Sequence, residues 1–261
     1  MRPLVVLPLS LAVLCLVAGC GRSSGDDPGE SPPVLRVGLE PEFEPMEYRT
    51  PEGEITGFDV ELIQALGAEM GYRVELLPVA WDGIIAALKT KKIDVICSGM
   101  TITEKRKQSI SFTRPYFSTH LCLLVNREKG EEIKSYRDLD RPDIVLAVKR
   151  ATTGEKTAEE LMPQAQRRIY DTENDCALEV ANGRAHAFVY DRASILKHAR
   201  QHARKTFTLL EPFNTEDYGI AVRQDDIDLL EKLNRALDAI QADGRYQRIK
   251  DRYIPRDASG E

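Results

Sequence analysis

The sequence predicts an α/β fold with largely parallel sheets, built as two similar halves. From Val34 onward, short apolar strand patterns alternate with segments whose apolar residues recur at helical spacing. Residues 81–99 and 173–191 also share one plan, a helix, a basic turn and a buried strand that ends in polar residues. Because ligands of open α/β sheets bind beyond the carboxyl ends of strands, we expect two half-sites, one in each lobe.

The N-terminal segment predicts export and a membrane anchor. Arg2 precedes a run of about fourteen apolar residues, which is too short to cross a bilayer and is typical of a secretory signal. Residues 16–20, Leu-Val-Ala-Gly-Cys, resemble the lipobox of bacterial lipoproteins, which implies a signal peptide over residues 1–19 and lipidation of Cys20, for example by palmitate. A plain secretory signal with an incidental Cys20 is the alternative. Residues 20–33 then form a flexible tether of small and charged residues.

The first half of the body reads as alternating strands and helices. In order, we expect a strand at 35–38, a helix at 58–70 with Gly71 as its C-terminal cap, a strand at 73–77, a helix at 84–88 and a buried strand at 93–97.

The second half continues the alternation. We expect strands at 121–125, 144–148, 187–190 and 219–222, and helices at 155–161, 173–181, 227–240 and 246–253. The helix at 227–240 has one apolar stripe, formed by Ile227, Leu230, Leu233, Leu237 and Ile240.

Composition argues against several classes of protein. The chain of 261 residues has a formal net charge of −6, whereas a nucleic-acid-binding protein needs a basic face. The 30% of charged residues are evenly mixed, which argues against disorder and against a multi-span membrane protein. The four histidines are scattered, so we expect no metal site and no cofactor.

Polar residues after the strand at 93–97 suit a carboxylate ligand. Thr101 and Thr103 supply hydroxyl groups, and Arg106 supplies a guanidinium group that binds a carboxylate through two hydrogen bonds. The alternative is an ordinary helix start, capped by Thr103 and with Arg106 in solvent.

The second half offers matching candidates. Residues 149–154, which include Thr153, lie between a strand and a helix, where free backbone N–H groups attract anions; an ordinary turn is the alternative. Asp191 ends a buried strand, where a carboxylate is costly unless it is paired, and a ligand ammonium group would pair with it. A helix cap is the alternative for Asp191.

Three further residues lie near strand ends. Phe43 and Trp81 are candidates for the walls of a small pocket, and core packing is the alternative. Glu40 is a candidate to face the same cleft, and a surface position is the alternative.

Six motifs together resemble the polar amino-acid-binding proteins of bacterial ABC importers, that is, family 3 of the extracellular solute-binding proteins. The similarity extends over about residues 34–255. The motifs are Gly57-Phe58-Asp59-Val60-Glu61-Leu62, Trp81-Asp82-Gly83-Ile84-Ile85-Ala86-Ala87-Leu88, Lys92-Ile93-Asp94-Val95-Ile96, Ser98-Gly99-Met100-Thr101-Ile102-Thr103, Thr152-Thr153-Gly154-Glu155 and Asp217-Tyr218-Gly219-Ile220-Ala221.

This resemblance implies a two-lobed periplasmic-binding-protein fold of type II, with two hinge strands that cross between the lobes. Lobe 1 would comprise residues 34–115 and 219–255, and lobe 2 residues 119–216. The crossings would lie at 116–118 and 216–218, and residues 256–261 would be a tail.

The resemblance also implies roles for the candidate residues. Arg106 would pair with the ligand α-carboxylate, helped by the N–H groups of Thr101 and Thr153. Asp191 would bind the α-ammonium group, together with the backbone of Ser98 and Gly99 and the Thr101 hydroxyl. Phe43 and Trp81 would enclose the ligand side chain, and Glu40 would favour arginine, lysine, histidine or glutamine over acidic ligands.

The implied function is capture of a small amino acid outside the cytoplasm. We expect a lipid-anchored monomer, on the periplasmic face of a membrane or the outer face of the cell membrane, that delivers its ligand to an ABC permease and its ATPase, without catalysis. One alternative is an enzyme resembling cyclohexadienyl (prephenate or arogenate) dehydratase, with Glu40 or Asp191 as general acid. The other alternative is a sensor for a separate receptor.

Three cysteines remain after lipidation, Cys97, Cys122 and Cys176. Their odd number leaves at least one thiol free, and we expect Cys97 and Cys122 to be buried as small apolar residues rather than joined in a disulfide.

Overall fold

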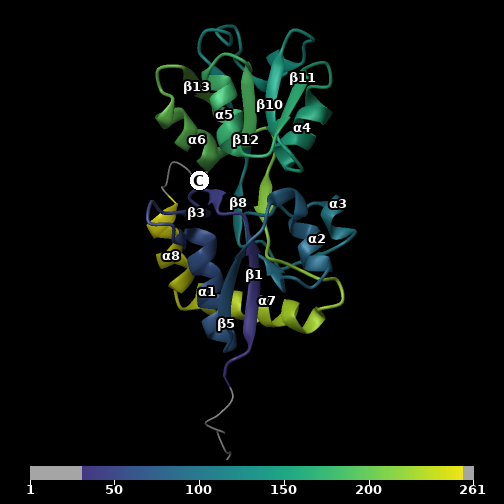
Figure 1. Cartoon of the computed structure of the whole chain (residues 1–261), viewed down its shortest axis with the longest axis vertical. Helices are drawn as coiled ribbons and strands as arrows, with labels where there is room; N and C mark the ends of the chain where they lie inside the picture. The colour runs from purple at the N-terminus through teal and green to yellow at the C-terminus, as the bar shows by residue number, and fades with distance from the viewer. Residues whose placement is uncertain (1–30, 255–261) are drawn as a thin grey trace, which may run out of the picture. The chain divides into compact units, whose positions relative to one another are not determined.

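Two five-stranded sheets, each covered by helices, confirm the predicted α/β class (Figure 1). The expectation of largely parallel sheets is wrong, because two of the four strand pairings in each sheet are antiparallel. The computed structural model describes residues 31–254. The predicted signal peptide, Cys20, most of the tether and the tail lie outside the described residues. In residues 31–254, no helix is long and apolar enough to span a bilayer.

The first sheet has the strand order β5-β1-β6-β15-β7. These strands are β5 (Arg73–Pro78), β1 (Val34–Leu39), β6 (Val95–Ile96), β15 (Ala221–Val222) and β7 (Ser111–Phe112). Strand β1 is parallel to β5 and β6, and β15 is antiparallel to its two neighbours. The predicted strands at 93–97 and 219–222 are therefore shorter than expected, although the N–H groups of Asp94 and Cys97 still donate to carbonyl groups of β1.

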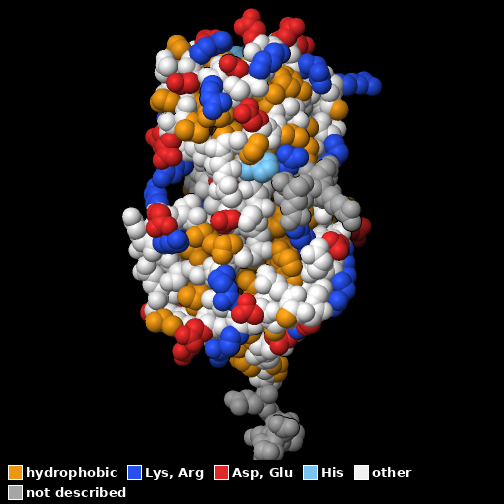
Figure 2. Space-filling view, turned by 180° about the vertical axis from the view of Figure 1, so that it is seen from behind, with side chains coloured by type: hydrophobic (Ala, Val, Ile, Leu, Met, Phe, Trp, Pro, Cys, Tyr) orange, Lys and Arg blue, Asp and Glu red, His pale blue; other side chains and the backbone are white. Residues whose placement is uncertain are grey.

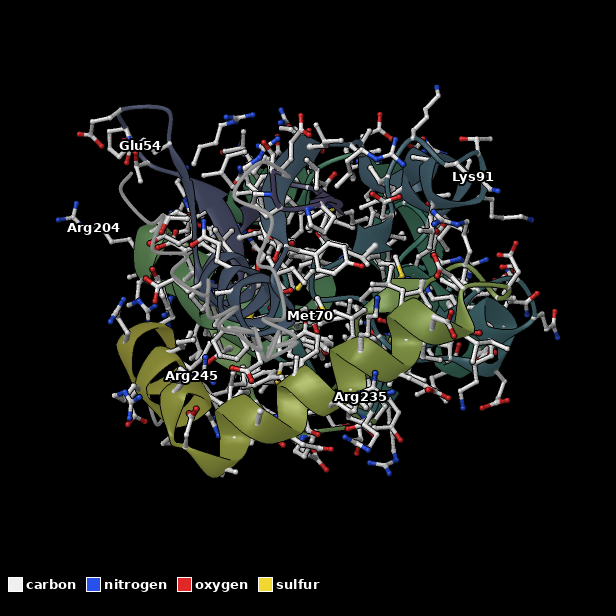
Figure 3. All side chains as sticks on the ribbon, turned by 90° about the horizontal axis from the view of Figure 1, so that it is seen from below. Glu54, Met70, Lys91, Arg204, Arg235 and Arg245 are labelled. Atoms are coloured by element: carbon white, nitrogen blue, oxygen red, sulfur yellow. The ribbon has the colours of Figure 1, made fainter. Side chains whose placement is uncertain are left out.

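Four helices of this first lobe have more than one turn. They are α1 (Phe58–Met70), α2 (Ile84–Lys89), α7 (Ile227–Ala242) and α8 (Arg245–Tyr253). Helix α1 contacts α7 and α8. In Figure 3, α7 runs diagonally across the lower part of the view and α8 lies at the left. Helix α1 ends at Gly71, whose φ of 73° is in the left-handed region that favours glycine.

The apolar stripe of α7 is only partly as predicted. Leu233, Leu237 and Ile240 are buried, but Ile227 is 60% exposed and Leu230 is partly buried. Ile227 is the first residue of the helix, and the buried face begins at Leu229 instead.

The second sheet has the order β11-β10-β12-β9-β13. Its strands are β11 (Gln166–Tyr170), β10 (Val145–Lys149), β12 (Ala187–Asp191), β9 (Leu121–Asn126) and β13 (Thr206–Leu209). Strand β10 is parallel to β11 and β12, and β9 is antiparallel to β12 and β13. Helices α4 (Thr153–Leu161), α5 (Glu173–Ala181) and α6 (Arg192–Gln201) complete this second lobe.

Two short strands connect the sheets. Strand β8 (Phe117–Thr119) follows β7 and precedes β9, and β14 (Glu216–Tyr218) follows β13 and precedes β15. The two strands pair antiparallel, with Glu216 opposite Thr119 and Tyr218 opposite Phe117. The chain therefore passes between the two sheets once in each direction.

The remaining elements are short. Strands β2 (Glu42–Phe43), β3 (Glu47–Arg49) and β4 (Ile55–Thr56) form a small antiparallel sheet, and helix α3 (Glu104–Lys107) has one turn. Two 3₁₀ turns lie at Trp81–Gly83 and Tyr136–Leu139. On the face drawn in Figure 2, Lys and Arg side chains are interspersed with Asp and Glu side chains, in line with the mixed charge of the sequence.

Candidate ligand-binding site

One cavity brings together all nine of the predicted ligand-binding residues. It is lined by Glu40, Phe43, Glu47, Trp81, Ser98, Gly99, Thr101, Arg106, Thr152, Thr153, Tyr190 and Asp191. Glu47 and Tyr190 were not among the sequence candidates, and Thr152 belongs to the predicted anion-attracting segment 149–154 without having been assigned a role of its own. Glu40 follows the carboxyl end of β1, Ser98 follows β6 and Asp191 ends β12, so the lining groups lie where open α/β sheets bind ligands.

Arg106 lies at the junction of the two lobes. Its backbone N–H donates to the Thr103 hydroxyl oxygen at 3.2 Å, so Thr103 does cap the short helix α3. The Arg106 guanidinium is not free in solvent, because it donates to the Thr101 carbonyl at 2.8 Å and to the Ala151 carbonyl, in the second lobe, at 3.3 Å. The helix-start alternative is therefore right for Thr103 and wrong for Arg106.

Asp191 presents a buried carboxylate to the same cavity. It precedes helix α6, but its side chain makes no capping hydrogen bond, so the cap alternative is wrong for this side chain. Its carboxylate accepts the hydroxyl of Tyr218 from the hinge strand β14. Burial and the neighbouring Glu216 raise the pKa of Asp191 to about 8. A ligand ammonium group at this position would stabilise the charged form.

Glu40 is not a surface acid. One oxygen of its carboxylate accepts the N–H of Trp81 at 3.2 Å, and the other accepts the ammonium group of Lys149, at the end of β10 in the second lobe. Burial raises the pKa of Glu40, and the Lys149 charge opposes this shift. The sequence placed Lys149 in a turn and gave no sign that its side chain is buried.

The aromatic side chains line the cavity and also pack against other rings. Phe43 is 6% exposed, and its ring centroid lies 5.6 Å from that of Tyr190 and 6.3 Å from that of Tyr218. Trp81 donates its indole N–H to the Ala151 carbonyl at 3.1 Å and therefore connects the lobes. The wall and core alternatives are thus both correct for Phe43.

Gly99 has to be glycine for two reasons. Its φ of 50° is in the left-handed region, and a Cβ atom at this position would lie 2.4 Å from the ring of Phe43. Its N–H donates to the carboxylate of Asp59 at 2.7 Å, which fixes the turn after β6.

Two buried carboxyl groups lie behind this turn, and the sequence did not identify either as a site residue. Glu47 accepts the Ser98 hydroxyl at 2.6 Å, and Asp59 accepts the Tyr116 hydroxyl at 2.6 Å. Burial raises the pKa of Asp59 to about 6, and burial beside Asp59 raises the pKa of Glu47 well above its usual range. Glu47 lies in a short hairpin without clear periodicity, so no sequence pattern distinguished it from a surface acid.

Thr152 and Thr153 begin helix α4 on the opposite wall. The Thr152 hydroxyl accepts the N–H of Glu155 at 3.2 Å and so caps the helix. Glu216 of the hinge strand is buried, which raises its pKa, while hydrogen bonds from Thr101 and Thr153 lower it. The cavity thus joins residues of both lobes, and two of its lining residues, Thr101 and Thr153, contact Glu216 of the hinge strand.

The described residues contain neither a metal-binding cluster nor a disulfide. Within residues 31–254, no cluster of three or more His, Cys, Asp or Glu side chains is arranged to hold a metal ion. Cys97, Cys122 and Cys176 are free and buried, so Cys97 and Cys122 form no disulfide and fill apolar space.

Comparison with known proteins agrees with this architecture. The family model of the bacterial extracellular solute-binding proteins, family 3, matches residues 35–256. The chain is 33% identical to an L-arginine-binding protein of Pseudomonas aeruginosa, over 87% of this chain and 90% of that protein. It is also 33% identical to a probable histidine-binding protein of Neisseria gonorrhoeae, over 98% of this chain and 97% of that protein.

Solved structures give the same result. An ancestral arginine-binding protein bound to arginine has a TM-score of 0.81 and 35% identity, over 87% of this chain and 100% of that one. An ancestral arginine-binding protein bound to glutamine has a TM-score of 0.79 and 36% identity, over 87% of this chain and 98% of that one. The described chain therefore belongs to family 3 of the bacterial extracellular solute-binding proteins.

Proposed function

We propose that this protein binds a small polar amino acid between its two lobes, with a basic or amide side chain favoured, and delivers it to an ABC permease and its ATPase. One observation carries the proposal: a guanidinium group of the first lobe and a carboxylate of the second lobe line one cavity. An amino acid has a carboxylate and an ammonium group on one carbon atom, so it matches both charges at once.

In this proposal the residues of the site have the roles that the family resemblance implies. Arg106 binds the α-carboxylate, together with the backbone N–H groups of Thr101 and Thr153. Asp191 binds the α-ammonium group, with Ser98, Gly99 and the Thr101 hydroxyl as further partners. The aromatic side chains of Phe43 and Trp81 enclose the ligand side chain. The site has no part in catalysis in this proposal, and the arginine- and histidine-binding names of the relatives support binding without turnover.

Closure of the lobes makes capture selective. Because Arg106 and Asp191 belong to different lobes, the ligand contributes contacts to both only when the lobes are together. Strands β8 and β14 are the connections at which such a motion takes place. A ligand that lacks either α-group leaves one buried charge without its partner.

A screen of the twenty amino acids by thermal shift identifies the ligand, since binding to the native state raises its stability. Calorimetry then tests the site. Arg106→Ala and Asp191→Ala should each weaken binding by about thirtyfold or more, because loss of one partner of a buried charge pair costs roughly 2–5 kcal/mol. Lys107→Ala is the matched control, because Lys107 lies on the same helix and its side chain is half exposed. Near-normal affinity in both site variants would contradict the site.

We also propose that the protein is held at a membrane outside the cytoplasm by lipid on Cys20. The lipobox-like residues 16–20 support this proposal. More than one acyl chain gives firm anchoring, whereas a single chain binds only marginally. In the producing bacterium, Cys20→Ser should move the protein from the membrane fraction to the soluble fraction and abolish labelling by palmitate. Membrane retention of the variant would contradict the anchor.

A further inference from the structure

The negative charge of Glu40 is already balanced within the protein. Both carboxylate oxygens are occupied, one by the Trp81 N–H and the other by the Lys149 ammonium group. Lys149 is 1% exposed, so this is a buried ion pair that joins the first lobe to the second. A cationic ligand side chain would therefore meet a carboxylate that has a cation beside it.

The Lys149 ammonium group retains capacity for another partner. An ammonium group carries three N–H donors, and within residues 31–254 the hydrogen-bond acceptor of Lys149 Nζ is Glu40. Nζ also lies 6.0 Å from the ring centroid of Trp81, a residue that lines the cavity. A ligand group that accepts a hydrogen bond is therefore favoured beside Lys149.

The charges of the site thus form two balanced pairs. Arg106 and Asp191 match the α-carboxylate and α-ammonium groups, and Glu40 and Lys149 balance each other near the side-chain end. A cationic side chain is repelled by Lys149, and an anionic one by Glu40. A neutral group that both donates and accepts hydrogen bonds suits a carboxylate and an ammonium group together.

We propose that the ligand side chain ends in a neutral carboxamide or ureido group, and that Lys149 determines this preference. This inference rests on the proposed function and narrows it, since basic and amide side chains are no longer equivalent. Lys149 is then a specificity-determining residue, a role that the sequence did not indicate for its side chain.

Glu47 is the remaining carboxyl group of the cavity, and burial opposes its negative charge. One oxygen accepts the Ser98 hydroxyl, and the other is buried without a hydrogen-bond partner among residues 31–254. Burial beside Asp59 raises the pKa of Glu47 and so favours its protonated form. A protonated carboxyl group donates and accepts hydrogen bonds, which again suits a neutral polar side chain.

The test compares ligands that differ in charge and little in shape. Citrulline and arginine are one such pair, and glutamine and glutamate are the other. Titration calorimetry of the wild-type protein should give citrulline at least about tenfold higher affinity than arginine, and glutamine at least about tenfold higher affinity than glutamate, since uncompensated charge in a buried site weakens binding by this much or more.

Two variants should each weaken the preference for a neutral side chain, one in favour of a cationic ligand and the other in favour of an anionic ligand. Lys149→Met leaves Glu40 without its cation and should shift the arginine-to-citrulline affinity ratio towards arginine by at least about tenfold. Glu40→Gln leaves Lys149 without its anion and should shift the glutamate-to-glutamine ratio towards glutamate by a similar factor. Lys156→Met, at an exposed lysine of helix α4, is the matched control and should change neither ratio.

The outcomes separate this inference from the proposed function. Tighter wild-type binding of arginine than of citrulline, with the same ratio in Lys149→Met, would overturn the role of Lys149 and leave amino-acid binding intact. Absence of binding for every amino acid would contradict the proposed function instead. If a variant is not folded, as judged by the loss of a cooperative unfolding transition, the wild-type affinity ratios still test the preference for a neutral side chain, because they need no substitution.

Discussion

The Asp191 carboxylate lies in an environment that opposes its charge. It is 7% exposed, it accepts the Tyr218 hydroxyl and it lies near the buried Glu216, which together with burial raises its pKa to about 8. At neutral pH the protein therefore favours a protonated Asp191, although the proposed role needs the charged form. Residues that bind ligand are thus not optimised for the stability of the protein alone.

This conflict predicts how stability depends on pH. The pKa of an unfolded aspartate is about 3.9, so between about pH 4 and pH 8 the native state holds a proton that the unfolded state has lost. The free energy of unfolding should fall across this range by at most about 1.4 kcal/mol per pH unit on account of Asp191. Asp191→Asn removes this loss, so its advantage over the wild type should grow as the pH rises.

Urea unfolding of the protein without amino acid, at pH 5 and at pH 8, checks this prediction. The exposed Asp82 gives the control Asp82→Asn, which should follow the wild type at both pH values. A stability difference between Asp191→Asn and wild type that is equal at both pH values would contradict the raised pKa. The same variant should bind amino acids weakly, because an amide does not balance an ammonium group.

At the scale of elements, the sequence was sufficient where apolar side chains set the pattern. Helix α1 was expected at 58–70 and lies at Phe58–Met70, because its buried residues recur at helical spacing and Gly71 ends it. The central strands β10 and β12 were also recognisable, because both are almost entirely buried.

Elements with polar partners were not predictable in this way. Strand β11 (Gln166–Tyr170) pairs only with β10 at the edge of its sheet, so its side chains need not be apolar. Helix α6 buries Ser194 and His198, whose partner is the carboxylate of Glu173 on α5, at 2.8 and 3.2 Å. Such pairing depends on contacts between segments that are distant in the sequence, so no local periodicity predicts it.

In the candidate site, too, some residues were identified from the local sequence and others were not. Residues that follow strand ends, such as Ser98 and Asp191, were identified because the carboxyl ends of parallel strands converge. Glu47 and Lys149 were not, because their burial depends on packing between the hairpin, the sheets and the opposite lobe. Lys149 matters most for the expected ligand, because it balances the charge of Glu40, which the sequence suggested would attract a basic or amide side chain.

At the scale of the whole described body, three polar contacts join the lobes beside the ring pair of Phe43 and Tyr190. Trp81 and Arg106 of the first lobe donate to the Ala151 carbonyl of the second, and Glu40 pairs with Lys149. All three contacts break when the lobes separate. The proposed ligand adds further bonds to Arg106 and Asp191 in the same place, so its binding shifts the equilibrium towards closure by its differential affinity for the closed state.

The central claim is that an amino acid closes the lobes by joining Arg106 to Asp191. Small-angle X-ray scattering measures this directly, on the wild type and on Asp191→Ala, each with and without a saturating concentration of the amino acid found in the screen. Binding should reduce the radius of gyration of the wild type and leave that of the variant unchanged. An unchanged wild-type radius of gyration at full occupancy, or equal compaction of the variant, would contradict it.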